Sequence, residues 1–64
     1  MIEGDEKYIV QESMQKYGGS FITNLGQALA CADMVNTQKI KNTWSEEWDR
    51  YFNMGKKEFN GDLR

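Results

Sequence analysis

The chain has 64 residues, enough for one domain at most, and a chain of this length buries only about 60% of the surface that its unfolded form exposes. Its net charge of −2 comes from ten acidic and eight basic residues scattered along the sequence, so it provides neither a field that attracts nucleic acid nor an acidic mimic of DNA. The hydrophobic content of 39%, with two Trp, three Tyr and three Phe, is too high for a disordered chain, so we expect it to fold.

The sequence offers no covalent or metal support for so small a core. Cys31 is the only cysteine, which excludes an intramolecular disulfide, and the absence of His excludes a cage of soft metal ligands. No apolar run approaches the roughly 18 residues of a membrane span, and the acidic N-terminus is unlike a secretory signal. We therefore expect a reduced, cytoplasmic setting, no membrane contact, and stabilisation by packing or self-association.

The first predicted helix covers about residues 5–17. Asp5 can cap its start, and an apolar stripe at spacings of three and four residues marks its inward face. The pair Gly18 and Gly19 ends the helix, because a glycine just past the last turn readily takes the left-handed conformation that closes it. The inward stripe consists of Val10, Met14 and Tyr17, with Ile9 beside it.

The second predicted helix, residues 20–32, has the clearest pattern in the chain, with Ser20 as its N-cap. Gly26 indicates a close approach of another helix, because glycine in a helix interior costs about 1 kcal/mol relative to Ala. Cys31 is expected to be a small buried hydrophobe, with a redox or intermolecular thiol as the alternative. The apolar positions are Phe21, Ile22, Leu25, Ala28, Leu29 and Ala32.

Two interpretations compete for the segment after the Asp33 cap. Either one helix runs from about residue 34 to 53, or a helix over 34–43 breaks near Trp44 and another covers 45–54. We prefer the break, with Ser45 as a cap, because acidic residues then occupy the first turn of the last helix, where they complement the helix dipole. Those acids are Glu46 and Glu47, and Gly55 is expected to end the helix.

An aromatic cluster carries most of the bulk of the expected core. Its four rings fall on one side of a helix, and they fill the space that the small residues of segment 20–32 leave open. At most one ring, Trp44 or Trp48, is expected to be partly exposed, where it would mark a protein interface. The alternative is a stacking platform for single-stranded nucleic acid. The cluster consists of Trp44, Trp48, Tyr51 and Phe52.

These elements predict an all-α fold without a sheet: a bundle of three to four short helices at about 5–17, 20–32, 34–43 and 45–54. No stretch alternates with a period of two residues, and the chain contains no Pro. Residues 1–54 are expected to form one helical domain, and residues 55–64 a mobile C-terminal tail.

Over residues 10–53 the chain carries, in order, the elements KYGGSF (16–21), AD (32–33), Asn36, KIK (39–41), TW (43–44), EW (47–48) and Tyr51. This order of residues resembles a group of short, uncharacterised proteins encoded by bacteriophages and prophages. That group often has proline where this chain has Met34 and Ser45, and proline favours first-turn positions, so the resemblance supports helix starts there. It implies a viral gene and the cytoplasm of the host cell, and it carries over no functional residue.

An enzyme is not expected. The chain has no His to activate a nucleophile, and its size leaves little room for a substrate pocket, a cofactor or a small-molecule ligand. The neighbouring acids Glu46, Glu47 and Asp49 diverge by about 100° per residue on a helix, so they do not converge on a metal ion or a reacting atom.

The sequence therefore favours a small interaction protein, either a homodimer or a chain that docks on a host protein and modulates or inhibits a host or defence factor. A nucleic-acid-binding regulator that uses a helix with Lys39 and Lys41 is one alternative. A minor virion or assembly component is another. The candidate residues for a partner interface are Lys39, Lys41, Trp44, Trp48 and Arg50.

Overall fold

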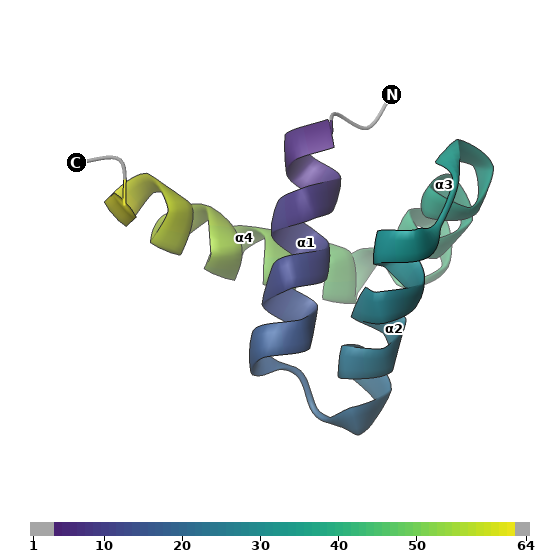
Figure 1. Cartoon of the computed structure of the whole chain (residues 1–64), viewed down its shortest axis with the longest axis horizontal. Helices are drawn as coiled ribbons and strands as arrows, with labels where there is room; N and C mark the ends of the chain where they lie inside the picture. Colours follow the sequence, from purple (N-terminus) through teal and green to yellow (C-terminus); the bar gives the residue numbers. More distant parts are fainter. Residues whose placement is uncertain (1–3, 63–64) are drawn as a thin grey trace.

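Four α-helices follow one another with connections of only one or two residues. The computed structural model describes residues 4–62, with side chains over residues 6–57, and this part of the chain contains no strand. Helix α1 spans Gly4–Tyr17, α2 Ser20–Cys31, α3 Met34–Thr43 and α4 Ser45–Asp62. Helices α1 and α2 form an antiparallel hairpin, α4 crosses behind α1, and α3 lies beside α2 (Figure 1). The predicted all-α fold with a break between residues 43 and 45 is confirmed.

The core lies where α1, α2 and α4 meet. Helix α3 contributes one buried residue, Thr37, so it packs at the margin of the molecule. The partly buried side chains of Ile22, Ile40, Trp44 and Phe52 surround the core. The buried apolar side chains are Val10, Met14, Leu25, Leu29, Trp48 and Tyr51.

Glycine allows α1 to approach two other helices closely. A Cβ atom at Gly26 of α2 would lie 2.8 Å from the Met14 Cβ and 3.0 Å from the Gln11 carbonyl oxygen, which confirms the close approach expected there. Gly55 has the same role between α4 and α1, because a Cβ there would collide with the Ser13 hydroxyl and come within 2.6 Å of the Ile9 side chain.

The helix end expected at Gly55 is therefore wrong. Helix α4 continues through this glycine to Asp62, because the missing side chain serves contact with α1 rather than a turn. The prediction that residues 55–64 are mobile stays a prediction. Residues 63–64 lie outside the described residues.

The connection at Gly18 and Gly19 ends α1 as expected, but by a different mechanism. No glycine in the described part of the chain has a positive φ, so no left-handed residue closes α1. A Cβ at Gly18 would collide with the Ile22 side chain and come within 2.6 Å of the Met14 carbonyl oxygen. Glycine is therefore required at position 18 because no side chain fits there. The N-cap of α2 is Gly19, and Ser20 is the first helical residue instead of the expected cap.

The start of α3 and the break between α3 and α4 lie where the sequence predicts them, and contacts between nearby residues determine both. Asp33 caps α3 as predicted, with its Oδ1 accepting a hydrogen bond of 2.8 Å from the Asn36 amide. Trp44 has a non-helical backbone conformation (φ −117°, ψ 52°) and separates α3 from α4. Its amide donates to the Ile40 carbonyl, its carbonyl accepts from the Trp48 amide, and Ser45 is the first residue of α4 rather than a cap.

Three expectations about burial are corrected. Phe21 is 59% exposed and Tyr17 is 46% exposed, whereas both were expected to face the core. Cys31 is exposed as well. Helix α2 turns Leu25 and Leu29 toward the core, which leaves Phe21 at the edge of the apolar stripe and Cys31 beyond it.

Helix α1 begins at Gly4, so the backbone of Asp5 lies inside the helix and not at the expected cap position. Within the residues that the structure describes, no helix is both long and apolar enough to cross a membrane.

Candidate interaction groove

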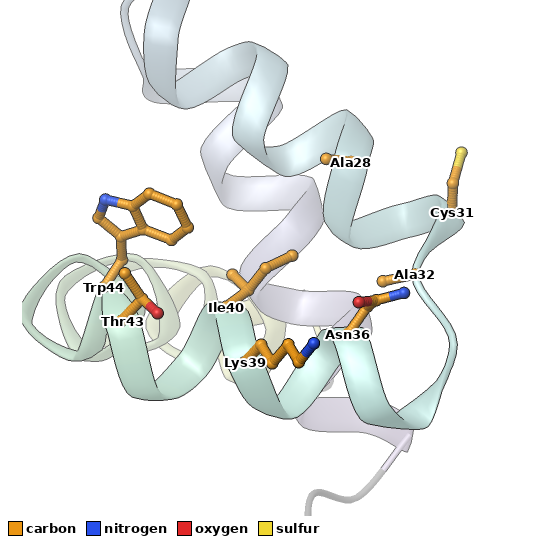
Figure 2. Close-up of a pocket in the computed structure, with 8 residues that line it drawn as sticks. All are labelled: Ala28, Cys31, Ala32, Asn36, Lys39, Ile40, Thr43 and Trp44. Atoms are coloured by element: carbon orange, nitrogen blue, oxygen red, sulfur yellow. The ribbon is translucent and has the colours of Figure 1, made fainter.

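An open groove of about 370 Å³ lies between α2 and α3 (Figure 2). Its apolar part is formed by Ala28 of α2, by Ala32 just after α2, by Ile40 of α3 and by Trp44 just after α3. Its edge carries polar groups. The residues that line it are Ala28, Cys31, Ala32, Asn36, Lys39, Ile40, Thr43 and Trp44.

The groove exists because α2 turns small side chains toward α3. Ile40 and Trp44 point from α3 toward α2, where Ala28 is too short to fill the space in front of them (Figure 2). The space beside this small-residue helix was expected to be filled by the aromatic cluster. Trp48 and Tyr51 are buried in the same core cluster as Leu25 and Leu29 of α2. Trp44 and Phe52 are only partly buried, so two rings of the cluster are partly exposed where at most one was expected.

An aromatic pair extends the apolar wall. The rings of Phe21 and Trp44 pack edge to face, with centroids 6.0 Å apart and an interplanar angle of 63°. This geometry is the one that ring quadrupoles favour. Because Phe21 is more than half exposed, the pair presents a rigid apolar surface beside the groove.

Polar side chains of α3 form the rim. Asn36, Lys39 and Thr43 are spaced at i, i+3 and i+7, which places them along one edge of the helix. The Lys39 side chain extends along α3 toward Asn36, and the Cys31 thiol points away from α3 (Figure 2). Among the lining residues, Lys39 alone carries a charge.

A polar cluster fixes the position of α3 and α4 against α1. Trp48 Nε1 donates a hydrogen bond of 2.7 Å to Glu6 Oε2, and Lys41 Nζ lies 3.2 Å from the same oxygen. Lys41 Nζ also lies 5.6 Å from the centroid of the Trp48 ring, within the range of a cation–π contact. Burial by itself raises the pKa of Glu6. The hydrogen bonds from Trp48 and Lys41 and the positive charge of Lys41 together lower it by more, so the pKa of Glu6 lies below its ordinary value of 4.5.

A second contact holds the corner between α2 and α3. Lys7 Nζ donates a hydrogen bond of 2.7 Å to the carbonyl oxygen of Ala32. One wall of the groove is thereby tied to α1 at the point where the chain turns. This contact joins the corner between α2 and α3 to a residue 25 positions earlier in the chain.

The five predicted interface residues are divided among different environments. Lys39 and Trp44 line the groove. Trp48 is completely buried in the core, Lys41 belongs to the cluster with Glu6, and Arg50 is exposed on α4 outside the groove lining.

The sequence prediction did not include Phe21, Ala28 or Ile40 in this surface. Phe21 and Ala28 are seven residues apart, a spacing that puts them on the same side of a helix. That signal was available, but the same spacing also fits core packing. Only the exposed fraction of Phe21 separates the two interpretations.

Few of the side chains that line the groove carry chemically reactive groups. It contains no carboxylate, and its one thiol belongs to a chain without His to activate it. Over the described residues, no group of three or more His, Cys, Asp or Glu side chains could hold a metal ion.

Comparison of the chain with family models, with curated proteins and with solved structures finds no match.

Proposed function

We propose that this protein acts by protein–protein interaction and that the groove between α2 and α3 docks a helical segment of another protein. The observation that carries the proposal is the aromatic pair of the exposed Phe21 and the partly buried Trp44 beside an open apolar groove. Aromatic side chains are enriched at protein interfaces, and Trp is among the residues that contribute most to binding energy. A groove of about 370 Å³ is also large enough to receive more than one side chain.

The dimensions of the groove fit a short helix. From Asn36 to Trp44 the α3 wall extends for about 12 Å, because a helix rises about 1.5 Å per residue. That length corresponds to about two turns of a bound helix, which would place apolar side chains at i, i+3 or i+4, and i+7 against Ile40 and Trp44.

The resemblance to short phage proteins suggests the biological setting of this interaction. In that setting the partner is a host protein, and the chain modulates or inhibits a host or defence factor in the host cytoplasm by occupying one of its surfaces. A homodimer and a minor virion or assembly component are the other protein-interaction alternatives.

A nucleic-acid-binding regulator has less support. It relies on Lys39 and Lys41, but Lys41 is within 3.2 Å of Glu6 and lies over the Trp48 ring. The positive charge of Lys41 is therefore largely offset within the fold, and Lys39 alone provides a weak phosphate contact.

Two matched variants of α2 test the proposal. Ala28→Arg places a large charged side chain in the groove, and Ala30→Arg makes the same change at another exposed position of the same helix outside the groove lining. Immobilised wild-type chain and both variants are incubated with an extract of cells that carry the gene, and the captured proteins are quantified by mass spectrometry.

We expect capture of the partner to be lost with Ala28→Arg and retained with Ala30→Arg, while circular dichroism shows equal helix content in both. Equal capture by the two variants would place the interaction outside the groove. Salt-sensitive binding of DNA or RNA by the wild-type chain would favour the nucleic-acid alternative instead.

A further inference from the structure

We infer that the segment bound in the groove is an amphipathic helix with an acidic residue beside its apolar anchors, so that a carboxylate faces Lys39. This inference rests on the proposed function and specifies the chemistry of the partner. It is based on the distribution of charge and of hydrogen-bond donors around the groove.

The residues that line the groove include one cation and no acidic side chain. Lys39 is the one charged side chain among the lining residues. The nearby cation Lys41 already has a carboxylate, since its Nζ lies 3.2 Å from Glu6 Oε2. Among the residues that the structure describes, Lys39 has no such ion pair, so a carboxylate on a partner would complement it at the edge of the apolar surface.

The neighbours of Lys39 are compatible with this preference. Asn36 and Thr43 flank it on the same edge of α3, and their amide and hydroxyl groups can both donate hydrogen bonds to a carboxylate. An acidic partner therefore meets a row of three donors about 11 Å long, the distance that seven residues cover along a helix. A basic partner would meet the Lys39 ammonium group at the centre of the same row.

The same distribution argues against a second copy of this chain as the occupant. A two-fold dimer pairs a surface with itself, so residues that line the groove in one copy face the lining of the other. Such pairing brings two Lys39 side chains toward one interface and supplies no lining carboxylate. A partner of different sequence satisfies both the apolar wall and the charge.

A library of displayed amphipathic helical peptides provides the test. The peptides share apolar residues at i, i+3 or i+4, and i+7, and the flanking positions are random. They are selected against the wild-type chain and the Lys39→Glu, Lys57→Glu and Ala28→Arg variants. Lys57 is an exposed residue of α4 outside the groove and serves as the charge control.

We expect the wild-type chain and Lys57→Glu to enrich peptides with Asp or Glu beside the anchors, Lys39→Glu to enrich Lys or Arg there, and Ala28→Arg to enrich neither. For a selected acidic peptide, Lys39→Glu should raise the dissociation constant about fivefold or more, and the effect should shrink as salt rises.

The other results are distinguishable. Peptides that need an open groove but show no charge preference, or the same preference with Lys39→Glu, overturn the acidic-partner inference and leave the proposed function standing. If no peptide depends on the groove, both fail. Concentration-dependent dimerisation of the wild-type chain that Ala28→Arg abolishes would identify a second copy as the occupant and overturn the inference.

Discussion

The indole nitrogen of Trp48 donates a hydrogen bond of 2.7 Å to the Glu6 carboxylate, and so joins the buried ring of α4 to the start of α1 across 42 residues of chain. The ring is completely buried, and this contact satisfies its polar nitrogen. Because Lys41 pairs with the same oxygen, one carboxylate of α1 holds both α3 and α4. The orientation of the helices that border the groove depends on this junction.

We expect Trp48→Phe to lower the free energy of unfolding by about 2–3 kcal/mol, because it removes buried volume and leaves the Glu6 carboxylate without one donor. Glu6→Gln should cost less, about 1 kcal/mol, since an amide oxygen still accepts from the indole but no longer pairs with Lys41. Urea denaturation followed by circular dichroism measures both. Asp49→Asn, at an exposed position of α4, is the control and should change stability little.

Stability should fall at acid pH through Glu6. Its pKa is lower in the folded chain than the ordinary value of 4.5, so the unfolded chain binds the proton more tightly. The stabilisation by Glu6 is therefore complete above pH 4.5 and is lost as the pH falls through the lowered folded pKa. Thermal unfolding between pH 7 and pH 3 measures it, and Glu6→Gln should reduce the drop in Tm over this interval. An identical drop in wild type and variant would show that other groups cause it.

Removal of the Thr37 hydroxyl is expected to raise the stability of the chain, unlike the substitutions at Trp48 and Glu6. Its Oγ1 is buried without a hydrogen-bond partner, and the residue is only 4% exposed. Thr37→Val keeps the shape and removes the unsatisfied group, so we expect the free energy of unfolding to rise by about 1 kcal/mol.

Thr23→Val is the matched control, because the Thr23 hydroxyl donates a 3.0 Å hydrogen bond to the Gly18 carbonyl that the substitution removes. It should destabilise the chain by about 1 kcal/mol. Thermal denaturation compares the two variants, and a loss of stability in Thr37→Val would mean that its hydroxyl has a partner in solution.

Gly55→Ala tests the crossing of α1 and α4. Helix propensity alone predicts that Ala at this interior position stabilises the helix by about 1 kcal/mol. The added Cβ would instead collide with the Ser13 side chain and come within 3.2 Å of the Ile9 carbonyl oxygen. We therefore expect a net loss of about 1–2 kcal/mol in unfolding free energy.

Gly19→Ala provides the comparison, since no neighbouring atom lies within 4 Å of a Cβ at Gly19 and its backbone is extended. Its denaturation midpoint should stay close to that of the wild-type chain. A stabilising Gly55→Ala would show that α4 can move away from α1 without loss.

Local features of this chain could be read from its residues alone. The Asp33 cap and the interruption at Trp44 were predictable, because hydrogen bonds and backbone preferences within a few residues determine them. The packing role of Gly26 was predictable for a related reason, since a glycine inside a strongly apolar helix needs a neighbour to offset its cost. Four helices that begin close to the expected positions follow from such local signals.

The groove was only half predictable. The small side chains of α2 indicated a space to be filled, but the sequence did not reveal which aromatic rings would fill it. Trp48 enters the core and Phe21 stays exposed, although both occupy apolar positions of helical patterns. The choice depends on where α4 crosses α1, and contacts such as that between Trp48 and Glu6 determine that crossing.

The sequence by itself determined that the chain is helical, where α2 and α3 begin and end to within a residue, and which side of α2 carries its leucines, because these properties depend on residues at most four positions apart. Only the tertiary structure decided that α4 runs through Gly55, that Lys41 is paired, and that Lys39 and Trp44 border an open groove. Those outcomes depend on distances between helices that are far apart in sequence, and no local spacing of residues specifies such distances.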